Sequence, residues 1–462
     1  MNLPSSRLTT REKVSYSLGD TASNIFFHAV NVFIFYFYTD VFMLHPAAAG
    51  SLLLVTRLWD AISDPLMGSL SDRTRSRFGV YRPYLLWMAV PAGLAGYLAF
   101  ANPALGESCK LIYAYVTYIL LMTAYTAINV PYSALMGVMS ASPEERTSLS
   151  TFRFVGAFSG QLLVSLAFLP LVRLLGGGDE GKGFPHTMAI LAFLAILFFL
   201  LTFAGTRERV KPPKTRSSLA NDARLLFKNR PWVIMALAAL LTLSSAAIRW
   251  TVTPHYYKYY AGADASPYWW FLDRTSFVMT TGTLAFILGV FFTGHLSRRF
   301  GKRNSLMALT ILNGLSICSF FFIPRDAYLT MVIVNLITNL LAGPTPALVW
   351  AIYTDVADFG EWKFGHRMTG LAFSAAMFAQ KLGISLGGSL CGWTLALFGF
   401  VADQAPSEAT LNGLRIIFSL IPGLLAVATG IILLGYKLSH QQMQTVVREL
   451  AERREREAED HA

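Results

Sequence analysis

The sequence predicts an all-α membrane protein with twelve transmembrane helices, arranged as two six-helix halves around a central cavity. Hydrophobic residues make up 54% of the 462 residues and charged residues only 14%, whereas a soluble domain carries about 25% charged residues. Twelve apolar runs are long enough to cross a bilayer, which takes about 20 helical residues. A basic motif also recurs at matching positions in the two halves, as in an internal duplication.

The predicted spans are separated by loops of very different charge. The spans lie at residues 14–38, 47–71, 82–102, 111–139, 148–174, 186–205, 232–257, 275–297, 304–323, 328–355, 369–397 and 410–436. Lys and Arg gather in the loops near 73–82, 207–230 and 298–303, while the loops at 40–48 and 102–110 are nearly free of them. By the positive-inside rule, both termini are cytoplasmic in a multi-pass protein of the inner (plasma) membrane. The net charge of +11 comes from these loops and does not indicate a nucleic-acid partner.

The longest polar break between spans contains KPPKTRSS and predicts a linker. It divides the chain into a first half at 1–206, a linker at 207–231, a second half at 232–436 and a cytoplasmic tail at 437–462. The turn after the second span reads GSLSDRTRSRFGVYR from Gly68, and the turn after the eighth reads GHLSRRFGKRN from Gly294. Two halves with equivalent basic turns resemble the major facilitator superfamily, in which the substrate site lies near the bilayer midplane between the halves.

The second span carries charge inside the membrane. Arg57, Asp60 and Asp64 are spaced so that they share one helix face. Each acid costs about 2.5–3.5 kcal/mol near the bilayer centre, so this face must look at protein or a water-filled cavity. Membrane acids that bind and release a cation are typical of ion-coupled transporters. A structural Arg–Asp pair that only orients helices is the alternative for Arg57 and one of the acids.

Two further spans carry polar stripes. In the first span, one face of a Phe-rich helix holds four polar residues: Asp20, Asn24, His28 and Asn31. In the fourth span, three polar residues surround Pro131: Thr126, Asn129 and Ser133. The proline frees a backbone carbonyl that can serve a cation or a substrate. Both stripes are predicted to face the cavity, with hydrogen bonding between helices as the alternative.

Single cations interrupt three other apolar runs, namely Arg153, Arg249 and Lys381. An unpaired cation inside a helix bundle is strongly disfavoured, so we expect Asp20, Asp60 and Asp64 to be the partners of Arg153 and Lys381.

Other polar and small residues predict structural roles. The last part of the aromatic run at 255–260 suggests an outer interfacial belt. Acids near the end of the tenth span suggest a gate of ion pairs with nearby Arg and Lys: Asp355, Asp358 and Glu361. Small-residue pairs in the eleventh span let a neighbouring backbone approach closely: Gly383, Gly387, Gly388 and Gly392. The three cysteines form no motif.

Three motifs together resemble the glycoside–pentoside–hexuronide:cation symporter family, whose best-known members are the melibiose carriers. They are WDAISDPLMG followed by SDRTRSRFGVYRPY, the segment NVPYSAL, and TDVADFGEWKFGHRMTG followed by AQKLG. The resemblance covers nearly the whole chain. It implies a major facilitator fold and a secondary symporter that imports a sugar or sugar derivative (glycoside, pentoside or hexuronide) with H⁺ or Na⁺ by alternating access.

The resemblance also implies residue roles. Asp60 and Asp64 match the cation-site acids, Thr126 matches a cation-site threonine, and Ser63 stands where Asn is common. Asp20 matches the sugar-binding acid of the first helix, while Arg153 and Lys381 match a helix 5 arginine and a helix 11 lysine. Asn129 replaces an acid and Ser133 a sugar-stacking Trp of the melibiose carriers, which argues against a plain galactoside.

We therefore predict a transporter rather than an enzyme, since the sequence lacks a metal-ligand cluster, a nucleophile pair and a phosphate loop. The candidate substrate residues are Asp20, Asn24, Asn129, Ser133, Arg153, Arg249 and Lys381, and the candidate cation residues are Asp60, Ser63, Asp64 and Thr126. Asp60 and Asp64 would be the metal ligands if the cation is Na⁺. We expect no cofactor, and we expect the protein to be a monomer in the bilayer.

Candidate cations outnumber acids, which favours an anionic or strongly polar monosaccharide as the cargo. The loss of one oxygen ligand at Asn129 favours H⁺ as the coupling cation. An amphiphilic lipid or another non-sugar organic solute is the alternative cargo.

Overall fold

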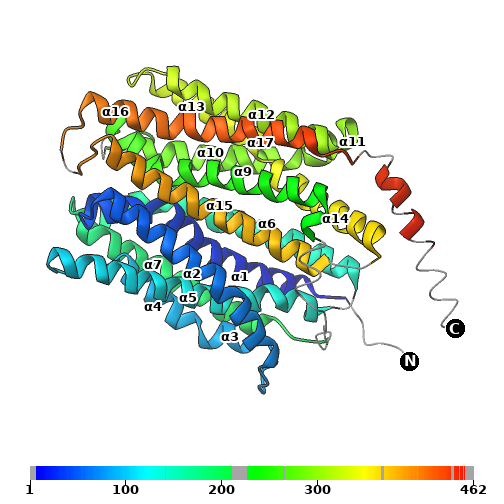
Figure 1. Cartoon of the computed structure of the whole chain (residues 1–462). Coiled ribbons are helices and arrows are strands. Elements are labelled where there is room, and N and C mark those ends of the chain that lie inside the picture. Colours follow the sequence, from blue (N-terminus) through cyan, green and yellow to red (C-terminus); the bar gives the residue numbers. More distant parts are fainter. Residues whose placement is uncertain are drawn as a thin grey trace. The chain divides into compact units, whose positions relative to one another are not determined.

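In the computed structural model of the chain, the regular secondary structure of the described residues is helical apart from two isolated β-bridges (Figure 1). It describes residues 7–140, 142–210, 226–263, 266–365, 369–402, 404–438 and 442–452, without 447 and 451. Eight helices in this part of the chain are long and apolar enough to cross a membrane. The predicted class, an all-α membrane protein, is confirmed, while the count of twelve crossings stays a prediction.

Each predicted span falls on a helix, because a bilayer leaves backbone N–H and C=O groups no partner outside the segment itself. The first six spans correspond to α1 (Thr10–Ala29) with the π-helical segments η1 (Val30–Ile34) and η2 (Phe37–Val41), α2 (Pro46–Arg73), α3 (Arg82–Trp87) with α4 (Ala89–Ala99), α5 (Glu107–Met139), α6 (Pro143–Gly176) and α7 (Glu180–Gly205).

The other six spans follow the same pattern, with ends that differ from the prediction by several residues. They correspond to α9 (Arg230–His255) with η3 (Tyr256–Tyr260), α10 (Arg274–Phe291) with α11 (Thr293–Phe300), α12 (Lys302–Ser319) with η4 (Phe320–Phe322), α13 (Tyr328–Ala342) with α14 (Thr345–Phe364), α15 (Thr369–Leu397), and α16 (Glu408–Arg415), η5 (Ile416–Leu420), α17 (Ile421–Ile432) and η6 (Leu433–Gly435). The tenth span is broken before Pro344, whose ring disfavours a continuous helix.

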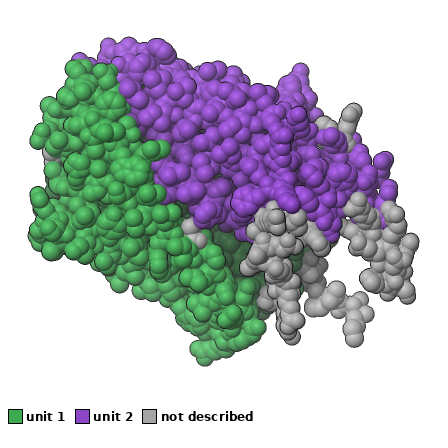
Figure 2. Space-filling model, viewed as in Figure 1, with its two compact units in different colours: residues 1–214, 250–283, 388–414 green, residues 215–249, 284–387, 415–462 purple. Residues whose placement is uncertain are grey.

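The described chain forms two compact units (Figure 2). Unit 1 contains residues 1–214, 250–283 and 388–414, and unit 2 contains 215–249, 284–387 and 415–462. Unit 1 therefore joins the first part of the chain to two segments of the predicted second half. The division into halves at the linker stays a prediction.

Close packing of α1 against α6 in unit 1 depends on two glycines. A Cβ atom at Gly156 would lie 2.2 Å from the backbone oxygen of Ser17, and one at Gly160 would lie 2.5 Å from that of Thr21. No larger side chain fits without separating the helices. This contact brings the polar stripe of the first span next to the fifth span.

The glycines of α15 pack in the way the sequence predicts. A Cβ at Gly383 would lie 2.4 Å from the backbone oxygen of Leu240, and one at Gly387 would lie 2.4 Å from that of Ser244. The hydroxyl of Ser244 also donates to the backbone oxygen of Gly383 at 3.0 Å. Small residues therefore let α15 and α9 approach closely in unit 2.

The repeated basic turns make equivalent contacts in the two parts of the chain. Arg82 donates to the backbone oxygen of Phe203, near the end of α7, at 2.7 Å. Arg303 donates to the backbone oxygen of Leu434, just beyond α17, at 2.9 Å. In each case the Arg that follows Phe-Gly binds the end of the last apolar helix of its predicted half. This shared geometry supports the internal duplication read from the sequence.

Two predictions about polar ends have different outcomes. The ion pair expected for Asp355 is present, with Lys302 at 2.7 Å, while its role as a gate stays a prediction. The interfacial belt is wrong for Tyr256, Tyr257 and Tyr260, because all three side chains are buried. Their neighbours in the run bind a buried acid and draw the whole segment into unit 1.

Candidate functional site

The acids of α2 lie on its buried side, as their spacing predicts. Asp60 is 2% exposed and Asp64 is half-buried, whereas Ile62 and Leu66 on other faces are 59% and 64% exposed. Arg57 is also buried and donates to the side-chain oxygen of Asn31 in η1 at 2.9 Å. The charged face of α2 is therefore turned toward protein and the apolar residues toward the surroundings.

Thr126 of α5 joins the two acids. Its hydroxyl lies 2.8 Å from Oδ1 of Asp60 and 3.0 Å from Oδ1 of Asp64. Ser63 makes a different contact, since its hydroxyl donates to the backbone oxygen of Asp60 at 3.1 Å. Two carboxyl groups and a hydroxyl thus converge at one point inside unit 1. No group of three or more His, Cys, Asp or Glu side chains gathers as a metal centre within the described residues, so any cation held here would depend on carboxylate and hydroxyl oxygens.

The chemistry of a hydroxyl limits the protonation of this pair. Thr126 carries one O–H donor and two acceptor lone pairs. It can donate to only one carboxylate at a time. Both contacts are satisfied together when the second carboxyl carries a proton and donates that proton to the Thr126 oxygen. The arrangement can therefore hold one proton between two acids, and like charges this close favour such sharing.

A second polar group lies where α1, α5 and α6 meet. Arg153 donates from Nε to Oδ2 of Asp20 at 2.5 Å and from Nη2 to the hydroxyl of Ser133 at 3.2 Å. The Asp20 side chain is 9% exposed and that of Arg153 is 28% exposed. The predicted pairing of the α6 cation with a membrane acid is present, and it leaves part of the guanidinium open to a ligand.

Sequence reasoning missed Tyr132, which completes this group. Its hydroxyl lies 3.2 Å from Oδ2 of Asp20, and Arg153 lies over its ring at 5.4 Å. The ring also stacks on Tyr16 with centroids 4.7 Å apart. Its position beside Pro131 in an otherwise polar stripe was the available signal. Because Tyr132 is fully buried, it does not replace the sugar-stacking Trp that the melibiose carriers have at the position of Ser133.

The remaining candidates of α1 and α5 lie close to these groups but make mostly local contacts. Asn24 donates to the backbone oxygen of Asp20 at 2.9 Å, and Asn129 accepts from the hydroxyl of Ser23 at 3.3 Å. His28 lies 3.0 Å from the hydroxyl of Ser165. Their role in binding stays a prediction.

Two candidates belong to unit 2. Arg249 lies over the rings of Phe418 and Phe320 at 4.2 and 4.9 Å, and donates to the backbone oxygen of Phe418 at 3.3 Å. These contacts give Arg249 a packing function, and its role in substrate binding stays a prediction. Lys381 lies in α15 of the same unit, and its role likewise stays a prediction.

A third polar cluster, which the sequence analysis missed, surrounds Asp40 in η2. Its carboxylate lies 3.1 Å from Nε2 of His255 and 3.1 Å from Nζ of Lys258, and accepts from the hydroxyl of Tyr259. Neither Asp40 nor His255 has any exposed side-chain surface. The available signal was an acid near the end of the first span and two basic residues within the aromatic run.

Buried paired acids among helices long and apolar enough to cross a membrane are typical of an ion-coupled membrane transporter, and comparison with known proteins agrees. The chain matches the family described as MFS/sugar transport protein over residues 15–440. It belongs to this family.

Several relatives align over nearly the whole chain. The chain is 34% identical over 457 residues to the inner membrane symporter YicJ of Escherichia coli (strain K12), covering 97% of this chain and 96% of that protein. It is 35% identical to the provisionally named glycoside/cation symporter YagG of the same organism, covering 98% and 97%. It is 33% identical to the isoprimeverose transporter of Lactiplantibacillus pentosus, covering 92% and 88%.

The crystal structure of a D-xylose-proton symporter shares the fold with a TM-score of 0.61, at 16% identity, over 92% of this chain and 95% of that one. The resemblance to the glycoside–pentoside–hexuronide:cation symporters is confirmed by the sequence relatives. The chain is a cation-coupled membrane transporter and not an enzyme.

Proposed function

We propose that the protein imports a neutral glycoside or pentoside together with a proton. The observation that carries this proposal is the placement of Asp60 and Asp64 around the single hydroxyl of Thr126. Sugar cargo is supported by relatives of the chain, among them the isoprimeverose transporter. The lipid alternative has no comparable support.

Charge within unit 1 supports a neutral cargo. Three candidate acids, Asp20, Asp60 and Asp64, accompany two candidate cations, Arg57 and Arg153. Arg153 is engaged by Asp20 at 2.5 Å, so its positive charge is not spare for an anionic sugar. The preference for an anion read from the sequence depended on that spare charge. Two acids that share one hydroxyl instead favour a co-transported cation, whose binding neutralises charge at the pair.

A proton suits the acid pair better than a sodium ion. A hard metal cation takes several oxygen ligands, usually six or more for Ca²⁺ and Mg²⁺. The described contacts supply two carboxylates and one hydroxyl, and the hydroxyl of Ser63 points to its own helix backbone. A single proton satisfies the same three groups without further ligands.

The orientation follows from the basic turns. We infer that the turns after α2 and α11, together with both termini, face the cytoplasm of the inner membrane, and that the protein acts as a monomer. The excess of Lys and Arg in these turns supports this topology.

Uptake into membrane vesicles tests the proposed function. Vesicles are given a proton gradient or a sodium gradient separately, with labelled isoprimeverose, D-xylose, D-glucuronate or lysolipid outside. We expect accumulation of a neutral sugar under the proton gradient alone, and its loss after a protonophore is added. Accumulation under sodium alone, or a preference for D-glucuronate or lysolipid, would contradict the proposal.

Removing either member of the Asp20–Arg153 pair is expected to weaken sugar binding. Asp20→Ala deletes a carboxylate that can accept hydrogen bonds from sugar hydroxyls, and Arg153→Ala deletes a guanidinium that can donate hydrogen bonds to sugar oxygens. Hydrogen bonds to charged groups contribute about 1.5–3 kcal/mol, so affinity should fall roughly 10- to 100-fold. Equilibrium binding to the purified protein measures the change.

Ser159→Ala is the control for this pair, since Ser159 lies on α6, is exposed, and donates to the backbone oxygen of Val155 in the same helix. Wild-type affinity in both Asp20→Ala and Arg153→Ala would exclude this group as the sugar site.

A further inference from the structure

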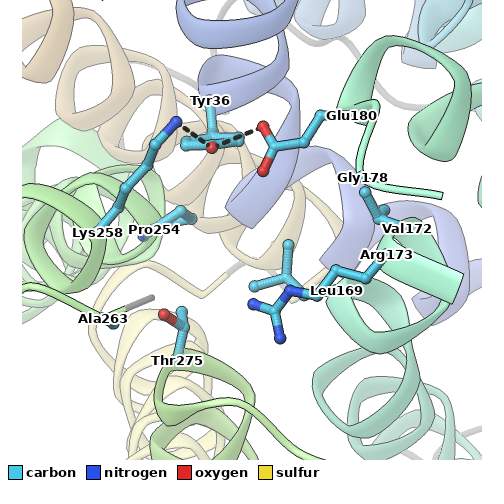
Figure 3. A pocket seen from close by; sticks show the side chains of 10 residues that line it. All are labelled: Tyr36, Leu169, Val172, Arg173, Gly178, Glu180, Pro254, Lys258, Ala263 and Thr275. Atoms are coloured by element: carbon cyan, nitrogen blue, oxygen red, sulfur yellow. Dashed lines mark hydrogen bonds between the residues drawn. The ribbon is translucent and has the colours of Figure 1, made fainter. Parts of the chain in front are cut away.

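A cavity of about 270 Å³ opens inside unit 1 between the ends of several helices (Figure 3). Tyr36, Lys258 and Glu180 lie along one side of it, and Arg173 and Thr275 lie across from them. Leu169, Val172 and Pro254 supply an apolar wall. The volume lies just below the usual 300–1,000 Å³ of sites for drug-sized ligands, which suits a single small solute.

This cavity is distinct from the Asp20–Arg153 group. Sixteen helical residues separate Asp20 from Tyr36, and twenty separate Arg153 from Arg173 on α6. At 1.5 Å per residue these separations correspond to about 24 Å and about 30 Å along the helices. The cavity therefore lies near the ends of these helices, whereas Arg153 lies well inside α6.

The polar groups of the cavity form a mixed set of donors and acceptors. Lys258 donates to the hydroxyl of Tyr36 at 2.6 Å, and this hydroxyl donates to Oε2 of Glu180 at 2.8 Å. Arg173 pairs through Nη2 with Asp273 at 2.9 Å. Among the described contacts, the other arm of Arg173 and Oε1 of Glu180 are not used. One side of the cavity can thus donate to a ligand while the other accepts from it.

Charge decides which ligand fits this set. Lys258 is neutralised by Asp40, and Arg173 by Asp273, and both carboxylates have no exposed side-chain surface. Glu180 is then the surplus charge, so an anion would meet net negative charge here. A hydroxyl both donates and accepts, and therefore satisfies Glu180 and Arg173 at the same time.

We propose that this cavity is a second binding site, for a neutral, hydroxyl-rich solute the size of a monosaccharide. The site would hold sugar at the membrane face opposite the basic turn that follows α2, before or after its passage through the Asp20–Arg153 group. The identity of the ligand as a sugar rests on the proposed function, whereas the site itself rests on the cavity and its polar groups.

Ligand-detected saturation-transfer NMR with D-xylose tests the site in full-length protein carrying Asp20→Ala. This background weakens the Asp20–Arg153 site and leaves the cavity intact. We expect the D-xylose signal to persist, and D-glucuronate to give none. Adding Ala263→Phe fills the cavity from its rim and should abolish the signal. Adding Glu180→Gln to the Asp20→Ala protein instead replaces one charged hydrogen-bond acceptor by a neutral one. We expect the affinity for D-xylose to fall about fivefold, which corresponds to about 1 kcal/mol.

Two matched variants serve as controls. Ala101→Phe enlarges a half-buried alanine in the turn between α4 and α5, and Asp179→Asn removes the carboxylate next to Glu180; neither residue lines the cavity. Both should keep the D-xylose signal. Loss of the D-xylose signal with Asp20→Ala alone, or its survival when Ala263→Phe is added, overturns the second site. Vesicle uptake can still support the proposed function in that case. Absence of D-xylose binding and of sugar uptake in the wild type overturns both.

Discussion

We expect Asp60→Asn and Asp64→Asn each to abolish the uphill accumulation of sugar and to leave protein levels in the membrane unchanged. Each substitution keeps the side-chain volume but removes a charge whose neutralisation by a cation drives coupling. Asp60 and Asp64 share the hydroxyl of Thr126, so the loss of either carboxyl disrupts the same site. Uptake into vesicles under an imposed proton gradient should then stop when the internal concentration equals the external one.

Sugar exchange without a gradient separates coupling from binding in these variants. The Asp20–Arg153 group does not include either α2 acid, so exchange should continue where accumulation fails. Asp326→Asn is the matched control, because Asp326 is exposed in the loop before α13. Wild-type accumulation in Asp60→Asn or Asp64→Asn would mean that the acid in question is not the coupling site.

Thr126 offers a finer comparison on a single helix. Thr126→Val removes the shared hydroxyl, whereas Thr123→Val, one turn earlier, removes an exposed hydroxyl that bonds Trp59 and the helix backbone. If the Thr126 hydroxyl holds a proton between the two acids, Thr126→Val should lose sugar accumulation under a proton gradient. Thr123→Val should accumulate sugar as the wild type does.

The sequence was sufficient for the helices and for the acids of α2. Spans of about 20 apolar residues have one stable backbone conformation in a bilayer, since water is absent there. Charge inside such a span has few tolerable placements, which is why the face of Arg57, Asp60 and Asp64 was predictable. Asp20 and Arg153 followed for the same reason, because each needed a partner of opposite charge within the bundle.

Residues that act through neutral or distant contacts were not predictable in the same way. Burying Tyr132 carries no charge penalty that would single it out in the sequence. Its stacking on Tyr16 depends on how α1 meets α5. Asp40 and Lys258 are more than two hundred residues apart, so no local periodicity connects them. The aromatic run around Lys258 fits either a lipid interface or a buried contact, and only the pairing with Asp40 decides between them.

That pairing leads to a large expected effect on stability. Asp40→Asn should lower the free energy of unfolding by about 3 kcal/mol, the lower end of the range for removing one partner of a buried ion pair. The wild-type carboxylate has no exposed surface and contacts His255 and Lys258 at 3.1 Å each. The lower end applies because the side chain of Lys258 is 33% exposed and can regain water. The shift in the midpoint of SDS-induced unfolding measures the loss.

The exposed pair Asp179–Lys182 provides a matched control near the same helix ends. Its side chains are 50% and 73% exposed and its atoms lie 3.3 Å apart, and such surface pairs contribute at most about 1 kcal/mol. Asp179→Asn should therefore leave the unfolding midpoint nearly unchanged. The double variant Asp40→Asn with Lys258→Met should recover part of the loss, since it no longer leaves an ammonium group against an amide. Equal midpoints for Asp40→Asn and Asp179→Asn would show that the buried cluster does not hold η2 against the segment from His255 to Tyr259.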